Sequence, residues 1–318
     1  MLKLSELDIV ESREALRLIP DGKVLINTIN AHSFNVAQKD ELFADALRTG
    51  FEPPLTPPLR KEGTTNGGDS LREEGTTNGG DPLRKEGTTN GGDSLRKEGT
   101  TNVCVKYLIP DGASIIKACR MLKAKSLPKE RIAGWDLFAF EMQRLTQKAE
   151  SRDQKAENRG AELKQKEDSR RQKLKVMFMG SSEKVLARIR EKAAVDYPNL
   201  EVVTYSPPYK PEFSNEDNAA IVKAINDANP DLLWIGMTAP KQEKWTYAHW
   251  KELKIHCHVG TIGAVFDFYA GTAQRAPEWW QEHSLEWLYR LVKEPKRMWR
   301  RYVIGNPLFL WNIGKEKV

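Results

Sequence analysis

The sequence predicts an α/β fold in which helices cover a mostly parallel, layered β-sheet. Short apolar runs typical of buried strands alternate along the 318 residues with amphipathic segments typical of helices. This alternation favours parallel strands, because each helix returns the chain to the edge of the sheet where the next strand begins. Polar residues follow several of the strands, which indicates a binding crevice at their carboxyl ends.

The expected elements follow one another along the chain with one long interruption. Strands are expected at 23–30, 103–112, 174–180, 200–206 and 231–237, and a strand with a turn at 254–268. Helices are expected at 37–50, 113–124, 181–194, 215–229 and 241–253. Ser181 and Ser182 are suited to cap the first turn of the third of these helices.

The interruption is an internal repeat between residues 51 and 102. The unit "LRKEGTTNGGDS" begins at Leu59 and recurs, with small changes, from Leu71 and Leu83 and in part from Leu95. Each unit offers one leucine, too little apolar surface to offset an ordering cost of roughly 1–2 kcal/mol per residue. We therefore expect a disordered insertion without a catalytic part. A calcium-binding repeat is the alternative, but the unit lacks the ligand spacing of a β-helix calcium repeat.

Charge divides the remainder of the chain. A run of mixed charge at 146–175 has almost no apolar stripe and is expected to be a solvated helix or linker within the core. Residues 286–302 carry six Lys and Arg against two Glu, much of the net charge of +6. A basic tail of this kind attracts nucleic acid, anionic lipid or a phosphorylated substrate. The expected organisation is a core at 1–50 and 103–285 and a C-terminal appendage at 286–318.

Location can be argued from what the sequence lacks. No apolar run approaches the roughly 20 residues that a membrane span requires. The first residues soon become acidic, unlike a signal peptide. Three cysteines follow no regular spacing. Together these features favour a reduced, cytoplasmic setting.

Polar residues gather at the predicted strand ends. They occur in "NTIN", "PDG", "MGSS", "APKQE" and "GAVFDF". Asp111 of "PDG" is a candidate general base, although the same triplet is a common turn. Gly180 stands between a strand and a helix whose N-terminus could hold phosphate. The surrounding residues match neither the GxGxxG nor the P-loop pattern, which disfavours classical NAD binding and P-loop chemistry.

Two other groups leave their alternatives open. His256 and His258 lie on one side of a predicted strand, but without further His or Cys at metal-site spacing a structural role is favoured over zinc. Asp267 and Arg275 lie among aromatic residues, near Gly263 and Gly271. They form either a structural ion pair or a ligand contact.

Several longer motifs together resemble one known family. In chain order they are "TIN", "LIPDG", "ERIAGWDLF", "VMFMGSS", "GMTAPKQEKW", "GAVFDFYAGTAQRAPEWW" and "LEWLYRLVKEPKRMWRRY". They resemble the WecG/TagA/CpsF glycosyltransferases, bacterial enzymes of surface-polymer synthesis. The resemblance covers roughly residues 20–50 and 103–312. The repeat and the long charged run depart from the family pattern.

The resemblance implies a Rossmann-like core, a C-terminal appendage and a specific reaction. An N-acetylhexosamine-type sugar, ManNAc or its uronic acid, would pass from a UDP-sugar to a polyprenyl-diphosphate-linked acceptor. The motif matches assign Asp111 as the acidic base and place Thr28 and Asn30 in the same pocket. Arg131 becomes a candidate for the acceptor diphosphate, and Gln242 for the rim that holds the sugar nucleotide.

Further substrate contacts and the absence of cofactors are also expected. The additional candidates are Gly180, Ser181, Gly236, Glu243, Gly263, Asp267 and Arg275. No metal-binding DxD triplet of the kind familiar in other transferases occurs. We therefore expect no cofactor and metal-independent transfer, with arginine and backbone donors holding the diphosphate charge.

The basic tail is expected to meet either the membrane or the diphosphate. Its candidate residues are Arg290, Arg297, Arg300 and Arg301, which recur with Lys293 at mostly three- and four-residue spacings. A lipid-linked acceptor cannot leave the bilayer, so the tail would hold the protein on the inner face of an anionic membrane. Aromatic residues would lie at headgroup depth: Trp299 and Tyr302, with Phe309 and Trp311 beyond. The alternative is an ordinary packed helix whose aromatic residues face the core.

Two other classes of function compete with the transferase. A nucleic-acid binder would explain the basic, aromatic tail but not the polar strand ends, so no nucleic acid is expected as a partner. A catalytically inactive UDP-sugar-binding scaffold would result if the insertion spoils the site. Whether the chain forms a homo-oligomer is left open.

Overall fold

The computed structural model describes residues 1–49, 104–157, 172–277, 279–280, 283 and 285–317. The repeat insertion expected at 51–102 therefore lies outside the described residues. Only parts of the charged run at 146–175 are described, at its two ends. All statements below concern the described part of the chain.

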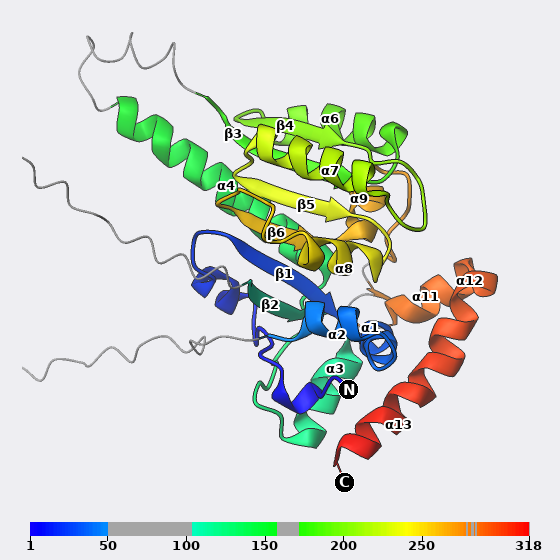
Figure 1. The fold of residues 1–318 in the computed structure, drawn as a ribbon. Helices are drawn as coiled ribbons and strands as arrows, with labels where there is room; N and C mark the ends of the chain where they lie inside the picture. Colours follow the sequence, from blue (N-terminus) through cyan, green and yellow to red (C-terminus); the bar gives the residue numbers. More distant parts are fainter. Residues whose placement is uncertain (50–103, 158–171, 278, 281–282, 284, 318) are drawn as a thin grey trace, which may run out of the picture. The chain divides into compact units, whose positions relative to one another are not determined.

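One parallel sheet organises the fold, as predicted (Figure 1). Its strands run in the order β2-β1-β6-β5-β3-β4. The strands are β1 (Val24–Ile29), β2 (Val105–Pro110), β3 (Leu174–Gly180), β4 (Leu200–Tyr205), β5 (Leu232–Gly236) and β6 (His258–Thr261). Every pair is parallel. All carboxyl ends therefore meet at one edge, where a Rossmann-like sheet binds its ligands.

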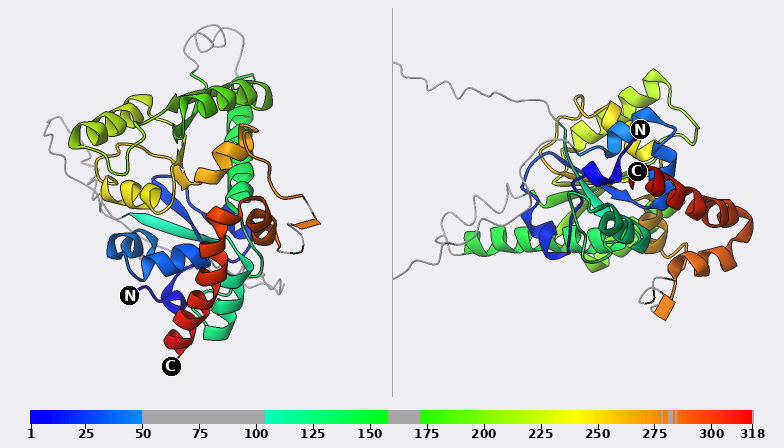
Figure 2. Two further views of the ribbon diagram at one scale, coloured as in Figure 1. Left: turned by 90° about the vertical axis from the view of Figure 1, so that its right-hand side faces the viewer. Right: turned by 90° about the horizontal axis from the view of Figure 1, so that it is seen from below.

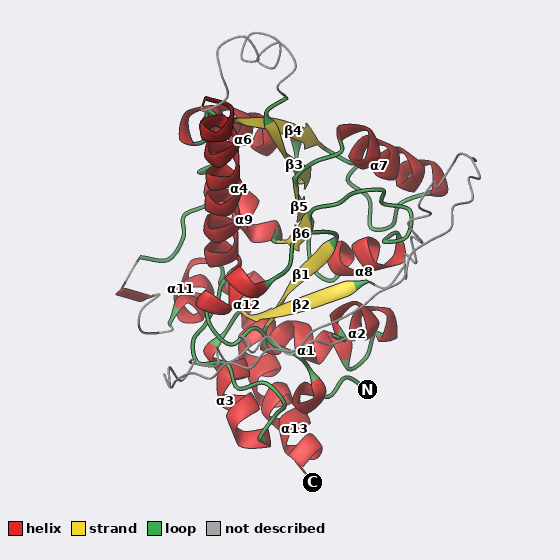
Figure 3. Ribbon diagram, turned by 90° about the vertical axis from the view of Figure 1, so that its left-hand side faces the viewer, coloured by secondary structure: helices red, strands yellow, loops and turns green. Residues whose placement is uncertain are grey.

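Helices cover both faces of this sheet (Figure 3). One face carries α4 (Gly134–Glu157), α6 (Glu183–Asp196) and α9 (Gly263–Tyr269). The other carries α2 (Glu41–Leu47), α7 (Asn215–Ala228) and α8 (Lys241–Ala248). Apolar side chains of the strands alternate between the two layers: Ile26 packs in the core with α4, and Leu25 in the core with α7.

The remaining elements lie around the β1–β2 side of the sheet. They are the short 3₁₀ helices η1 (Leu4–Glu6) and η2 (Glu14–Leu18), and the α-helices α1 (Ala31–Ala37) and α3 (Ala113–Leu122). The C-terminal helices are α11 (Glu286–Lys293), α12 (Pro295–Trp299), a π-helical turn η3 (Arg300–Ile304) and α13 (Gly305–Lys317). The sequence predicted a basic, helical appendage for this region, and the region is helical.

Three elements differ from the sequence prediction. Helix α1 was not predicted; its N-cap is Asn30, which forms a capping box with Ser33. Residues 263–269, expected as a turn after a strand, form α9, because Val265 and Phe266 fall on one buried helical face. Helix α4 begins at Gly134, so the start of the charged run is the solvated end of a helix whose first half lies in the core.

Helix α13 packs against α1 and α3, and one of its sides is buried (Figure 2 shows the helix). Its Phe309 is 2% exposed and meets Phe34 of α1 edge-on, with ring centroids 5.6 Å apart. Asn35 donates to the Gly305 carbonyl oxygen at 2.7 Å and accepts from Asn312 at 3.0 Å. The expectation that Phe309 lies at a membrane is therefore wrong, because this side of α13 packs on α1.

None of the helices in the described residues is both long and apolar enough to cross a bilayer.

Candidate active site

The ends of β1 and β2 bring Asp111 beside Thr28 and Asn30. Thr28 pairs with Ile109, and the Asp111 amide donates to the Ile29 carbonyl oxygen at 2.9 Å. Because side chains alternate along a strand, Asp111 lies on the same face as Ile109 and hence as Thr28. That face carries α4, so the predicted base and Thr28 open toward the layer of α4 and α9.

Asn30 also has a structural task at this edge. Its Oδ1 accepts from the backbone amides of His32 and Ser33, both at 3.0 Å, and so caps α1. Gly112, which follows Asp111, lies close to Asn30. A Cβ atom added to Gly112 would be 3.8 Å from the Cβ atom of Asn30. Capping by Asn30 fixes where α1 starts and which way the β1 end turns.

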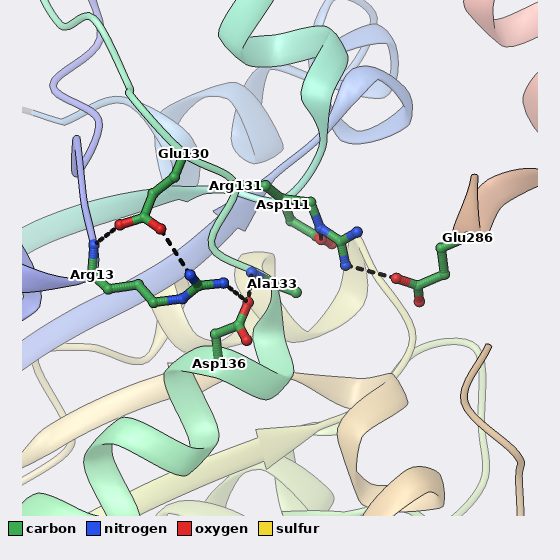
Figure 4. A network of polar contacts seen from close by, with 7 residues as sticks. All are labelled: Arg13, Asp111, Glu130, Arg131, Ala133, Asp136 and Glu286. Carbon is green, nitrogen blue, oxygen red and sulfur yellow. Dashed lines mark hydrogen bonds and ion pairs between the residues drawn. The ribbon is translucent and has the colours of Figure 1, made fainter. Parts of the chain in front are cut away.

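Arg131 reaches Asp111 from the loop before α4 (Figure 4). The Ile132 amide donates to the Pro110 carbonyl oxygen at 3.0 Å, which ties this loop to the end of β2. Arg131 Nε then lies 3.8 Å from Asp111 Oδ1. The other side of the same guanidinium donates from Nη2 to Glu286 Oε2 at 2.6 Å.

Glu286 extends the network into the C-terminal helices. Its Oε1 accepts from Arg290 Nη2 at 2.7 Å within α11. Arg301 follows in the π-helical turn and is close enough to Asp111 for its charge to act on that carboxyl. Arg275 lies above the Trp135 ring, 5.7 Å from its centroid, and feels the charge of Glu286. The charges of four arginines thus act on these two carboxylates.

The site shifts the protonation of its charged groups. Burial raises the pKa of Asp111; Arg131 opposes this shift and Glu286 adds to it. Burial also acts to raise the pKa of Glu286, but Arg290 and Arg131 outweigh it and hold that pKa below its usual range. The site therefore favours the ionised form of Glu286 and makes Asp111 a stronger base than an ordinary aspartate.

Gln242 and Glu243 hold the carboxyl ends of β5 and β6 together. Gln242 Oε1 accepts from the amides of Met237 and Gly263 at 3.1 and 3.2 Å. Its Nε2 donates to Glu243 Oε1 at 2.8 Å, and both side chains are buried. Burial raises the pKa of Glu243 to about 7. No hydrogen bond or ion pair among the described residues joins Gln242 or Glu243 to Asp111.

The three predicted substrate-binding glycines permit close packing at this edge. A Cβ atom on Gly180 would lie 2.4 Å from the Gly236 carbonyl oxygen, and one on Gly236 2.6 Å from the Phe266 ring. A Cβ atom on Gly263 would lie 2.2 Å from the Met237 carbonyl oxygen. Close packing therefore favours glycine at all three positions, and the backbone φ of 116° favours it further at Gly180.

Asp267 and Arg275 do not pair, although both lie in the described part of the chain. Asp267 accepts from the Thr272 hydroxyl at 3.2 Å and so orders the turn that follows α9. Arg275 belongs instead to the arginine cluster beside Glu286. Ser181 follows β3 in a left-handed backbone conformation, and its carbonyl oxygen accepts from the Ser206 hydroxyl at 2.9 Å.

His258 has a structural environment at the opposite, amino-terminal edge of the sheet. It is 5% exposed, with Nδ1 3.1 Å from Glu141 Oε1 and Nε2 2.8 Å from the Pro20 carbonyl oxygen. These contacts give His258 a structural role. The described residues hold no cluster of three or more His, Cys, Asp or Glu suited to a metal ion.

Some basic residues of the C-terminal helices face the site at Asp111, and others are exposed to solvent. Arg290 and Arg301 act on Asp111, whereas Arg300 is exposed and lies over the Trp299 ring, 5.4 Å from its centroid. Arg297 lies in α12, but its side chain is outside the described part of the structure. Sequence reasoning missed Glu286; its four-residue spacing from Arg290 on a helix was the signal that could have found it.

The fold and this cluster define a Rossmann-like α/β protein with arginines and carboxylates gathered at the carboxyl edge of its sheet. The model of the glycosyl transferase WecG/TagA/CpsF family matches residues 161–318. The chain belongs to this family, as the motifs predicted.

Three relatives carry the same printed name, N-acetylglucosaminyldiphosphoundecaprenol N-acetyl-beta-D-mannosaminyltransferase. The protein of Bacillus subtilis (strain 168) is 26% identical over 211 residues, which cover 66% of this chain and 69% of the relative. The protein of Bacillus spizizenii is 29% identical with the same coverage. The protein of Staphylococcus aureus (strain MW2) is 28% identical over 143 residues, which cover 45% of this chain and 53% of the relative.

Proposed function

We propose that this protein transfers an N-acetylhexosamine-type sugar, ManNAc or its uronic acid, from a UDP-sugar to a polyprenyl-diphosphate-linked acceptor. The observation that carries the proposal is Asp111 beside Arg131 at the carboxyl edge, with Arg290 and Arg301 supplied by the C-terminal helices. A general base and a diphosphate-binding cluster are the two parts that this reaction requires. The names of the relatives support the acceptor class.

Asp111 acts as the base in this proposal. Its carboxylate accepts the proton of the acceptor hydroxyl as the hydroxyl oxygen forms a bond to C1 of the donor sugar. The bond from C1 to the diphosphate oxygen breaks, and UDP leaves with that electron pair. Thr28, on the same face, lines the pocket, and Asn30 fixes its rim by capping α1.

Guanidinium groups stabilise the diphosphate charge in place of a metal ion in this proposal. The side chains of Arg131 and Arg290 are only 20% and 31% exposed. Their attraction to an anion is therefore screened less than it would be in water, because the effective dielectric constant is lower. Arg301 has a buried Nε atom without a hydrogen-bond partner in the described structure. A phosphate oxygen would supply that partner.

The outer side of the C-terminal helices fits an anionic membrane. Exposed large apolar residues occur along these helices: Val292, Trp299, Val303, Ile304, Leu310 and Trp311. Exposed cations lie among them, namely Lys293, Lys296, Arg300 and Lys315. Apolar and aromatic residues flanked by cations are the features of an interfacial helix. We propose peripheral docking on the inner face of the membrane, which brings the site to a lipid-linked acceptor.

The test is a transfer assay with a panel of UDP-sugars and a short-chain polyprenyl-diphosphate-GlcNAc acceptor, with and without EDTA. We expect one UDP-sugar to yield a lipid-linked disaccharide, undiminished by EDTA. UDP-sugar binding without turnover would support the inactive scaffold instead. Salt-sensitive RNA binding without UDP-sugar binding would support a nucleic-acid protein.

A further inference from the structure

Glu286 has no role in the reaction described above, yet it contacts two arginines of the cluster, Arg131 and Arg290. We propose that Glu286 is a positioning residue that fastens α11 to the core and holds Arg131 and Arg290 as one diphosphate-binding pair beside Asp111. The proposal rests on the proposed transfer reaction for its substrate. Its structural part, the fastening of α11, stands independently of that reaction.

The two oxygens of Glu286 bind different parts of the protein. Oε2 accepts from Arg131 of the core at 2.6 Å, and Oε1 accepts from Arg290 of α11 at 2.7 Å (Figure 4 shows the first contact). The Glu286 side chain is only 12% exposed, so solvent screens these contacts weakly. One carboxylate therefore joins the loop before α4 to the first C-terminal helix.

The carboxylate also overcomes a repulsion. Arg131 and Arg290 approach the same small anion, so their like charges lie close together. Without an anion between them they repel, and α11 would move away from the loop that carries Arg131. Glu286 supplies that anion before any substrate binds, and thus keeps the pair assembled in the free protein.

The bridge leaves donors for a ligand. A guanidinium carries five N–H groups, and Glu286 accepts from one on each arginine in the contacts described. Arg131 Nε remains 3.8 Å from Asp111, beyond hydrogen-bond distance. Four arginines (Arg131, Arg275, Arg290 and Arg301) outnumber the carboxylates of this cluster (Asp111, Glu286 and Asp136), which leaves positive charge for an anionic diphosphate.

The first readout needs no catalysis. Hydrogen–deuterium exchange of the α11 amides is measured in the full-length, ligand-free protein, for the wild type and for Glu286→Gln. We expect about tenfold faster exchange in the variant, the size of effect that loss of one charge-assisted contact produces. The control is Glu130→Gln, which removes the partner of Arg13 in the same network and should leave α11 unchanged. Unchanged exchange in Glu286→Gln would overturn the proposal.

The second readout separates positioning from a general loss of stability. Glu286→Gln should raise KM for the lipid acceptor about tenfold and have a smaller effect on kcat. It should also shift the acid limb of the pH profile of kcat/KM to lower pH. The negative charge of Glu286 raises the pKa of Asp111, whereas the three nearby arginines lower it, so loss of the Glu286 charge lowers that pKa. A residue that only stabilises the fold would lower the amount of active protein, and hence the apparent kcat, without raising KM.

A conservative variant completes the test. Glu286→Asp keeps the charge but is too short to contact both arginines at once. It should raise KM as Glu286→Gln does, yet keep the acid limb near its wild-type position. Wild-type KM in Glu286→Asp would overturn the bridge. If the wild type transfers no sugar at all, the exchange experiment still decides whether α11 is fastened, so the two proposals fail separately.

Discussion

Arg131 Nε lies 3.8 Å from Asp111 Oδ1, which is near enough for strong attraction but too far for a hydrogen bond. Asp111 thus feels a cation while its oxygens stay available to an acceptor hydroxyl. We predict that Asp111→Asn lowers kcat by about 100- to 10,000-fold, the usual effect of losing a general base. UDP-sugar binding, measured by calorimetry, should survive. Unchanged turnover would remove Asp111 from the mechanism.

The same contact predicts a pH effect. A base must be ionised, so transfer should fall as pH decreases through the pKa of Asp111, which burial raises above its usual range. Arg131 lowers this pKa, so Arg131→Met should raise it further and move the acid limb of kcat/KM to higher pH. The limb should move to lower pH in Glu286→Gln. The control is Arg13→Met, which removes the partner of Glu130 and should leave the acid limb at its wild-type pH. If the acid limb lies at the same pH in the wild type and in all variants, this electrostatic account is wrong.

The buried carboxyl of Glu243 predicts a stability effect. Its pKa is raised from 4.5 to about 7 by burial, so the folded state holds a proton that the unfolded state releases. Stability from this group is present below about pH 4.5 and is lost as pH rises to about 7, a change of about 3 kcal/mol. Glu243→Gln should remove this dependence. Urea denaturation at pH 4.5 and pH 8 measures it; parallel changes in wild type and variant would refute the assignment.

The layered fold could be predicted because its strands are apolar runs with helices between them. The missed elements have physical causes. Helix α1 depends on the Asn30 and Ser33 capping box, and Asn30 was interpreted only as a site residue. Phe266 and Val265 favour strands by propensity, but contact with Phe178 and Gly236 selects the helical α9.

The site was predictable where it follows strand ends and not where it depends on tertiary contacts. Asp111 and Thr28 follow from the register of two neighbouring parallel strands. No local pattern tells that Arg131 meets Glu286, 155 positions away in sequence. Likewise, Asp267 and Arg275 are close in sequence, but α9 ends between them and directs Arg275 to the other cluster.

The repeat predicts tolerance to deletion. Removing residues 51–102 and joining the flanking chain with a short Gly-Ser linker should leave folding and transfer largely intact, because each repeat unit offers only one leucine to a core. Circular dichroism, thermal melting and the transfer assay check this. A folded but inactive deletion protein would show that the repeat contributes to the site, and an insoluble one that it contributes to the fold. Limited proteolysis of the full chain should cut within the repeat first.

The two sides of α13 predict opposite effects of aromatic substitution. Phe309 is 2% exposed in the core, and Trp311, two residues later, is 63% exposed. Phe309→Ala should destabilise the fold by about 3–5 kcal/mol. Trp311→Ala should change the free energy of unfolding little, because it removes no core contact. Urea denaturation of the two variants separates these effects.

Membrane docking should depend on the exposed side alone. Wild-type protein should co-sediment with vesicles that contain anionic lipid, and the binding should weaken as salt shortens the screening length below about 10 Å. Trp311→Ala combined with Trp299→Ala should weaken this binding while leaving transfer to a short-chain, water-soluble acceptor intact. Arg300→Glu should weaken it further, since each basic residue near an anionic surface contributes about 1 kcal/mol. Glu183→Gln, on the distant helix α6, is the control. If the tryptophan and arginine variants co-sediment as well as the wild type, the C-terminal helices serve the fold and the site but not the membrane.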